Sequence, residues 1–343
     1  MKKLHIANIS FEAELAHPIH SIYPSNPIFL QLQYLPFLYA NPGDGIVVSH
    51  RQPGFPQLTQ HLLTDSNPNY DKIESWGGSE LIAKWAKKQK LPYPIPSWDT
   101  IRSVNSKAFS FQHSPKLPGA TLLENETQAL QWLQRPSPKV LKTCYGVSGQ
   151  GHLIIDSKNT PSDEKIFLFL QKEWSAKRPV IAEPWVERLL DFSTQWEIPT
   201  FGSIQFIGST ICENNTHGQY LSNRVGKEET LFQSHLPYLQ EHKHIALHML
   251  EKMQSLGFFG NVGIDAMLYI HPSTGNSALH PIVEINARKT MGWVSVIFQQ
   301  KHFPNHEIHF TYLPAEEGLL PSSIALASGK KIQFHRNLKI TVK

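Results

Sequence analysis

The sequence predicts a mixed α/β protein of two or three domains. Its 343 residues are too many for one ordinary hydrophobic core. Residues 3–90 alternate short apolar strand patterns with a helical pattern, which is typical of a small α/β domain. Residues 258–287 instead contain two consecutive strand patterns joined by a polar turn, which predicts antiparallel strands.

The N-terminal elements follow from hydrophobic periodicity. Alternation predicts a short strand over residues 3–9, and the apolar run at 45–50 predicts a buried strand after the turn "NPGDG". Residues 79–90 have helical spacing, because Leu81, Ile82 and Trp85 share one stripe. The proline-rich stretch at 91–98 then predicts a stiff connector and a domain boundary.

The remaining elements are predicted in the same way. Residues 138–156 have the pattern of a strand, a glycine-rich turn and a second strand, and residues 179–186 that of a short apolar strand. Residues 244–257 predict an amphipathic helix that Gly257 ends. The strands at 258–270 and 280–287 are joined by "HPSTGNSAL", which has the composition of a turn.

Composition limits the classes of function. Hydrophobic residues make up 40% and charged residues 17%, which favours a globular protein. The net charge of +4 is scattered, so nucleic acid is not an expected partner. The most apolar stretch, 28–40, is too short to cross a membrane, and Cys144 and Cys212 form no metal or disulfide pattern. We expect a cytoplasmic protein.

The predicted hairpin brings two acids together. If the turn is centred between Thr274 and Gly275, Asp265 lies opposite Glu284. Side chains of opposed residues share a face, about 5 Å apart at Cβ, and Asn286 shares it by the period of two. Two adjacent carboxylates repel unless a proton or a cation intervenes, and Mg²⁺ prefers oxygen ligands. The alternative is a solvated polar face on an edge hairpin.

A glycine-rich loop lies between two of the predicted strands. "YGVSGQG" at 145–151 has neither the dinucleotide nor the Walker spacing, and a strand follows it. It is either an ordinary turn or a flexible loop that offers backbone N–H groups to phosphates. Lys142, just before it, is either an edge-strand gatekeeper or a phosphate ligand. Lys107 by itself is most simply an exposed lysine.

Together, in this order, these segments resemble the ATP-grasp superfamily. The matching segments are Lys107, "LKTCYGVSGQG", "VIAEPWVE", "GNVGIDAML" and "VEINARKTMG". The resemblance covers roughly residues 100–300, and its last segment is the most specific. It implies an N-terminal α/β domain over 1–98, a lid subdomain with the flap over 99–182, and a C-terminal antiparallel-sheet subdomain over 183–343. A homodimer is a further expectation at the level of the family.

The resemblance implies a nucleotide site. Lys107 and Lys142 would contact the phosphates of ATP. The closing flap would consist of Gly146, Ser148, Gly149 and Gly151.

It also implies a hinge that binds the base and the sugar. Glu183 would accept the adenine amino group, and the backbone of Trp185 and Val186 would hold the purine edge. Asp191 would bind the ribose hydroxyls, with Glu187 as a competitor for that role. Pro184 departs from the family pattern, because a proline has no backbone N–H to donate.

The catalytic groups follow from the same resemblance. Asp265, Glu284 and Asn286 would ligate Mg²⁺, for which Mn²⁺ can substitute, although the first of these positions is often Glu in the family. Arg288 would meet the transferred phosphoryl group, with Arg224 as a second candidate. These roles imply an ATP-dependent ligase that activates a carboxylate as an acyl phosphate for attack by an amine. A non-catalytic ATP-binding regulatory protein and a phosphotransferase to a non-carboxylate acceptor remain as alternatives.

Overall fold

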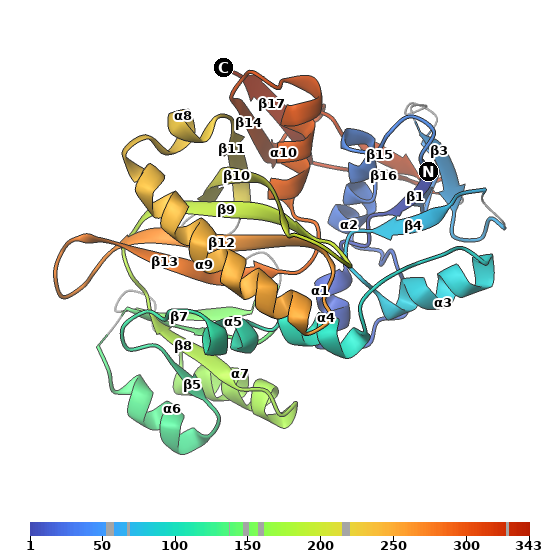
Figure 1. Cartoon of the computed structure of the whole chain (residues 1–343). Coiled ribbons are helices and arrows are strands. Elements are labelled where there is room, and N and C mark those ends of the chain that lie inside the picture. The colour runs from blue at the N-terminus through green and yellow to red at the C-terminus, as the bar shows by residue number, and fades with distance from the viewer. Residues whose placement is uncertain are drawn as a thin grey trace.

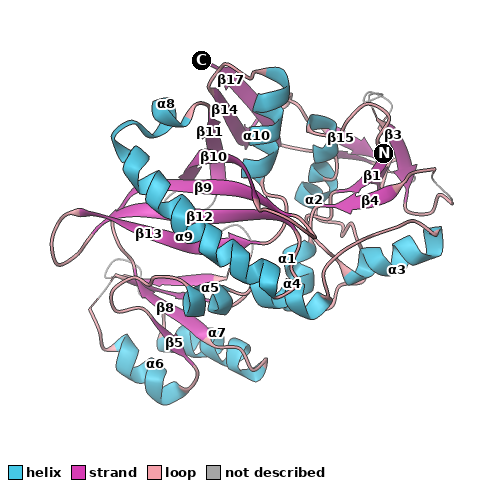
Figure 2. Ribbon diagram, in the orientation of Figure 1, coloured by secondary structure: helices cyan, strands magenta, loops and turns pink. Residues whose placement is uncertain are grey.

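The strands that we can describe form four sheets (Figures 1 and 2). The structure is a computed structural model and describes residues 1–52, 58–66, 69–136, 138–146, 151–156, 161–214, 220–326 and 329–343. The mixture of parallel and antiparallel sheets with covering helices confirms the predicted α/β (α+β) class.

The N-terminal sheet is parallel, in the order β3-β2-β1-β4. Its elements are β1 (Lys3–Ile6), α1 (Phe11–Ala16), α2 (Pro27–Leu32), η1 (Leu35–Leu38), β2 (Gly45–Val48), β3 (Thr59–Leu62), β4 (Lys72–Ser75) and α3 (Glu80–Gln89). The predicted strands near 3–9 and 45–50 and the helix over 79–90 are confirmed. The side chain of Ser79 caps α3 by accepting the N–H of Ile82 at 3.2 Å.

A second sheet has the order β5-β8-β6-β7. Its region contains α4 (Trp98–Val104), α5 (Lys107–His113), β5 (Thr121–Leu123), α6 (Glu126–Leu133), β6 (Lys139–Lys142), β7 (His152–Ile155), α7 (Asp163–Ser175) and β8 (Val180–Pro184). The strand, turn and strand predicted over 138–156 are therefore present as the antiparallel pair β6–β7. Because β6 pairs with β8 on its other side, Lys142 is not on an edge strand, and the gatekeeper interpretation is wrong.

The largest sheet has the order β13-β12-β9-β10-β11-β14-β17, and all its pairings are antiparallel. Its strands are β9 (Arg188–Ile198), β10 (Gln205–Asn214), β11 (Tyr220–Val225), β12 (Gly260–Ile270), β13 (Ser277–Asn286), β14 (Ile308–Pro314) and β17 (Arg336–Val342). The intervening elements are α8 (Glu228–Phe232), η2 (Gln233–His235), α9 (Leu236–Ser255), α10 (Met291–His302) and the ribbon of β15 (Ser323–Ala325) and β16 (Lys331–Gln333).

Helix α9 crosses one face of this sheet, in front of β9, β12 and β13 in Figure 1. Its buried Leu239 packs with Phe192 and Leu268 of the sheet. The helix begins eight residues before the predicted start, and Gly257, at φ +83°, follows its C-terminus as predicted. Helix α10 covers the opposite face, because Asn223 points away from the α9 core and contacts Ser295 of α10 at 3.4 Å.

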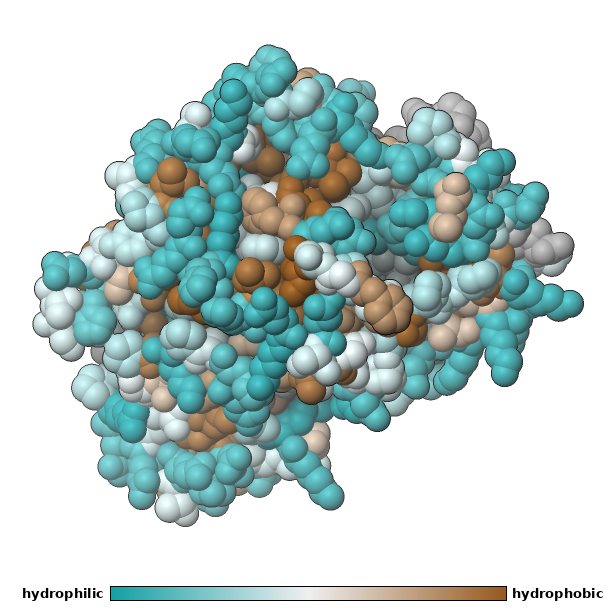
Figure 3. Space-filling model, in the orientation of Figure 1, coloured by the Kyte–Doolittle hydropathy of each residue, from teal (hydrophilic) through white to brown (hydrophobic). Residues whose placement is uncertain are grey.

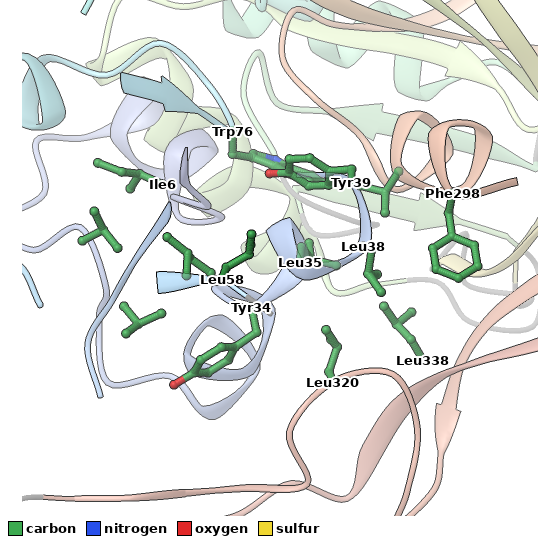
Figure 4. Close-up of a cluster of buried hydrophobic side chains, with 14 of the residues drawn as sticks. Ile6, Tyr34, Leu35, Leu38, Tyr39, Leu58, Trp76, Phe298, Leu320 and Leu338 are labelled. Carbon is green, nitrogen blue, oxygen red and sulfur yellow. The ribbon is translucent and has the colours of Figure 1, made fainter. Parts of the chain in front are cut away.

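The two ends of the chain share one core. Figure 4 shows Phe298, Leu320 and Leu338 gathered with Leu35 and Leu38 of the N-terminal region. The predicted boundaries at 98/99 and 182/183 stay predictions, but this shared core ties the C-terminal residues to the parallel sheet.

The surface seen in Figure 3 is mostly hydrophilic; hydrophobic residues show in the middle of this face and in smaller patches elsewhere. Among the helices described, none has both the length and the apolar character needed to cross a membrane.

Candidate functional site

The hairpin of β12 and β13 places Asp265 directly opposite Glu284, as predicted. The predicted turn position is nevertheless wrong. Ile270 lies opposite Ser277, so the turn is centred between residues 273 and 274, and an unbroken ladder from there would pair Asp265 with Ile282. A bulge in β13 changes the register. Met267 lies opposite His280 and Asp265 opposite Glu284, so β13 advances by four residues where β12 advances by two.

Three neighbouring strands then carry one polar row. Ser193 of β9, Asp265 of β12 and Glu284 of β13 lie opposite one another. Asn286 lies two residues farther along the same face, and its Nδ2 donates to Oδ2 of Asp265 at 3.0 Å. The sheet therefore collects two carboxylates and an amide on one surface, because side chains repeat with a period of two.

The electrostatics of this row favour a cation. Its enclosed position and the neighbouring Glu284 carboxylate raise the pKa of Asp265 to about 6. No group of three or more His, Cys, Asp or Glu side chains with the geometry of a metal site occurs among the described residues. The row instead offers two carboxylates and one amide oxygen. Oxygen ligands of this kind suit Mg²⁺ when substrate phosphates complete its coordination shell.

The row opens into a cavity of about 310 Å³. The cavity lies where the large sheet meets the β5-β8-β6-β7 sheet and the N-terminal region. The lining residues from α5, the β5-β8-β6-β7 sheet and the residues next to its strands are Lys107, Lys142, Gly146, Gly151, His152 and Trp185. Those from the large sheet and the segment after it include Arg188, Asp191, Ser193, Cys212, Asn223, Asp265, Glu284, Asn286, Arg288 and Thr290. Those from the N-terminal region are Ile9, Glu12, Leu32 and Trp76.

Both predicted lysines line this cavity, and each forms an ion pair with an acid. Lys107 is the first residue of α5, and its Nζ lies 2.7 Å from Oε1 of Glu284. Lys142 ends β6, and its Nζ lies 2.5 Å from Oε2 of Glu183. Burial alone would raise the pKa of Glu183, but the Lys142 ammonium lowers it below its usual range. The structure brings both lysines to the cavity, and each holds a compensating negative charge.

The chain after β13 turns sharply and brings Arg288 into the cavity. The N–H of Arg288 bonds the carbonyl of Asn286 at 2.8 Å, and its Nη2 donates to Asn286 Oδ1 at 3.0 Å. The same guanidinium forms an ion pair with Glu12 of α1. Burial raises the pKa of Glu12, and the positive charge of Arg288 opposes that rise. Glu12 belongs to no motif, so its place here could not be read from the sequence.

The hinge residues divide into two groups. Trp185 and Asp191 line the cavity, and Arg188 lies between them, 3.1 Å from Asp191 Oδ1 and 5.1 Å from the centre of the Trp185 ring. Glu183 instead lines a small neighbouring cavity of about 10 Å³. The N–H of Trp185 donates to the carbonyl of Pro138 at 3.0 Å, so this donor is already used.

The other two hinge candidates lie away from the cavity. Val186 packs with Tyr269 and Leu117, and Glu187 is exposed. Of the two residues that could bind a ribose, Asp191 is therefore the one that the structure places in the cavity.

The flap can be placed only at its ends. Gly146 and Gly151 line the cavity, whereas Ser148 and Gly149 lie outside the described residues. Gly151 has φ +88°, and a Cβ there would lie 2.6 Å from Oγ1 of Thr143. This position therefore requires glycine for both its backbone and its surroundings.

Arg224, the second candidate for contacting the transferred phosphoryl group, does not line the cavity. Its neighbour Asn223 lines the cavity, and Arg224 lies opposite Ile211, which packs on the α9 face. Successive side chains of a strand point to opposite faces, so Arg224 points away from the cavity. Its Nη2 instead lies 2.9 Å from Glu307.

Comparisons of the sequence add no family assignment. No protein-family model matches the chain, and no curated protein sequence matches it.

Solved structures do match. A biotin carboxylase-beta-gamma-ATP complex from Campylobacter jejuni has a TM-score of 0.58 at 14% identity and covers 94% of this chain and 78% of that one. A putative ATP-grasp superfamily protein from Archaeoglobus fulgidus has 0.53 at 12% identity and covers 100% of both chains. An L-amino acid ligase from Bacillus licheniformis has 0.52 at 13% identity, covering 93% and 81%.

Pyruvate carboxylase from Rhizobium etli matches 92% of this chain with a TM-score of 0.57 and 14% identity, and this chain spans only 31% of its length. At such identities a structural likeness establishes the fold. This chain has the fold of the ATP-grasp superfamily.

Proposed function

We propose that this protein is an ATP-dependent, Mg²⁺-requiring ligase that activates a carboxylate as an acyl phosphate for attack by an amine. The observation that carries the proposal is the row of Asp265, Glu284 and Asn286 in the same cavity as Lys107 and Arg288. The similarity in fold to a biotin carboxylase and an L-amino acid ligase supports the class of reaction.

The lining of the cavity suits the two parts of ATP at different places. The lid end offers the aromatic surface of Trp185 beside Arg188 and Asp191, which suits a base and a ribose. Lys142 and the two ends of the flap, Gly146 and Gly151, line the same cavity. ATP would therefore lie with its base at Trp185 and its phosphates toward Lys142, Lys107 and the acidic row.

Asp265, Glu284 and Asn286 would hold Mg²⁺. Bound there, the ion would neutralise phosphate oxygens and polarise the γ-phosphoryl group. Burial and the neighbouring Glu284 carboxylate raise the pKa of Asp265, so a cation bound beside the two acids would be stabilised. On ATP binding, Lys107 and Lys142 would each exchange a carboxylate partner for a phosphate oxygen. Their present partners are Glu284 and Glu183.

The chemistry needs positive charge more than it needs a nucleophile from the protein. An oxygen of the substrate carboxylate attacks the γ-phosphorus, and the bond to the β-γ bridging oxygen breaks to release ADP. The amine then attacks the acyl carbon, and inorganic phosphate leaves. Arg288 would stabilise the negative charge that spreads over the transferred group, a type of interaction typically worth a factor of about 10²–10³ in rate.

Hydroxylamine trapping tests the proposal. The protein is incubated with ATP, Mg²⁺, hydroxylamine and a panel of carboxylic acids, and ADP and hydroxamates are measured. We expect hydroxamate and ADP in equal amounts from at least one acid, and loss of both on chelation with EDTA or in Glu284→Gln and Asn286→Ala. A stable phosphorylated product would instead favour a phosphotransferase, and ATP binding without ADP would favour a regulatory protein.

A further inference from the structure

The end of the cavity at the N-terminal domain has an apolar wall. Ile9, Leu32 and Trp76 from that domain and Met291 at the start of α10 line it. Ile9, Leu32 and Met291 are partly exposed at the edge of the largest core cluster, and Trp76 is only 4% exposed. In the proposed arrangement ATP does not use this wall, because its base would lie at Trp185 and its phosphates at Lys142, Lys107 and the acidic row. The wall therefore suits an apolar part of the second ligand.

One charged pair stands beside this wall. Glu12 of α1 and Arg288 of the segment after β13 contact each other, and their side chains are 9% and 14% exposed. Arg288 also touches Asn286, so its guanidinium lies between the proposed phosphoryl-transfer centre and Glu12. The apolar wall, Glu12 and Arg288 thus line one end of a single cavity.

Glu12 is unfavourable for a ligand that carries only a carboxylate. A carboxylate that binds Arg288 competes with Glu12 for the same guanidinium, and it would leave a nearly buried acid without its partner. A ligand that brings an ammonium group next to its carboxylate removes this conflict, because each of its charges replaces one half of the existing pair. α-Amino acids have this arrangement.

We infer that this end of the cavity binds an α-amino acid with an apolar side chain as the carboxylate substrate. Arg288 binds its carboxylate, Glu12 binds its α-ammonium, and the wall of Ile9, Leu32, Trp76 and Met291 contacts its side chain. This inference rests on the proposed function and adds to it the class of the acid.

Glu14 provides a matched comparison on the same helix. Counted over the whole residue, Glu14 and Glu12 are equally exposed, at 8% each. The Oε1 of Glu14, however, accepts the N–H of Leu81 at 3.1 Å, and Glu14 does not line the described cavity. The burial of Glu14 is therefore accompanied by a hydrogen bond to the backbone of α3. Glu12 instead lines the cavity and forms an ion pair with Arg288, a group that the reaction would use.

Isothermal titration calorimetry tests the subsite without turnover. The protein, with Mg²⁺ and a non-hydrolysable ATP analogue, is titrated with L-leucine and L-phenylalanine and with their deaminated acids, 4-methylpentanoate and 3-phenylpropanoate. We expect at least one amino acid to bind at least about 30-fold more tightly than its deaminated acid. Glu12→Gln should reduce this ratio to below about 3, whereas Glu14→Gln should leave it unchanged.

Three results would overturn the inference: no binding of either amino acid, equal binding of an amino acid and its deaminated acid, or an unchanged ratio in a folded Glu12→Gln variant. If Glu12→Gln does not fold, the inference is judged on the wild-type protein, from the affinity of each amino acid relative to that of its deaminated acid. Failure of the proposed ligase function is a separate outcome, because it appears as the absence of hydroxamate in the trapping experiment even when an amino acid binds.

Discussion

The imidazole Nδ1 of His242 lies 2.7 Å from the carbonyl oxygen of Pro281. Pro281 is in the bulge of β13 that sets Glu284 opposite Asp265, and its missing N–H suits an interrupted ladder. A carbonyl can only accept, so Nδ1 carries the proton and Nε2 accepts from Thr194 Oγ1 at 2.7 Å. Helix α9 thus holds the bulge that sets the register of the acidic row.

This buried imidazole should make the protein sensitive to acid. Burial lowers the pKa of His242 to about 4, below the ordinary value of 6.5 that it regains on unfolding. The unfolded chain therefore binds more protons between these values, and the stability that the neutral imidazole contributes is lost as the pH falls through this window. His242 alone should reduce the free energy of unfolding by about 2 kcal/mol between pH 6.5 and pH 5.

Urea unfolding at pH 5, 6 and 7 measures this dependence. His242→Gln should be less stable at pH 7 but should lose less stability on acidification. His244→Gln, which changes an exposed residue of the same helix, is the control and should behave as wild type. Part of the dependence should persist in His242→Gln, because burial also lowers the pKa of His280 to about 4. An unchanged pH dependence in His242→Gln would contradict the assignment.

The Lys107–Glu284 pair predicts two effects of opposite sign. Lys107→Met removes an ammonium that competes with a divalent cation for Glu284, so Mn²⁺ should bind about 10-fold more tightly without nucleotide. The same variant should bind ATP about 10-fold more weakly, because a phosphate contact is lost.

Titration with Mn²⁺ and with ATP measures the two affinities. Lys142→Met is the matched control, because its partner Glu183 lies outside the acidic row. It should weaken ATP and leave Mn²⁺ unchanged. Unchanged or weaker Mn²⁺ binding in Lys107→Met would show that Lys107 does not compete at this site.

The two arginines singled out by the sequence should differ in their effect on activity. Arg288→Gln should lower kcat/KM by a factor of about 10²–10³, whereas Arg224→Gln should change it less than about 3-fold. Arg288→Lys keeps the charge beside Glu12 and should preserve folding while losing most of the rate, because the ammonium of lysine lacks the several N–H donors with which a planar guanidinium can bind a phosphoryl group. Equal losses in Arg224→Gln and Arg288→Gln would contradict the placement of Arg224.

Gly263 should tolerate no side chain. It lies opposite Asn286 in the ladder, and a Cβ there would lie 2.6 Å from Cγ2 of Thr290 and 3.0 Å from Oε1 of Gln195. Gly263→Ala should lower the free energy of unfolding by about 1–3 kcal/mol, measured in urea.

The double variant Gly263→Ala/Thr290→Ser tests the cause of that loss. Serine lacks the crowded Cγ2 but keeps the hydroxyl that bonds Gln195 and caps the N–H of Trp293. Part of the lost stability should therefore return. No recovery would place the strain at Gln195 instead.

The local sequence determined the contents of the site. The period of two in a strand predicted that Glu284 and Asn286 share one face. The composition of the turn predicted the hairpin, in which Asp265 lies opposite Glu284. Glycines and apolar runs likewise located β6, β7, α3 and the end of α9. These features depend on neighbours within a few residues, and such neighbours are visible in the chain itself.

The tertiary structure decided the register of β12 and β13, the face on which Arg224 lies and the partner of Arg288. The turn lies one residue earlier than its composition suggested, and only the bulge that contains Pro281 returns Asp265 to Glu284. The same applies to Arg224, whose face is fixed by the pairing of β10 and β11, and to Glu12, which reaches Arg288 from the other end of the chain. Such contacts depend on how distant segments pack, and no local pattern encodes that.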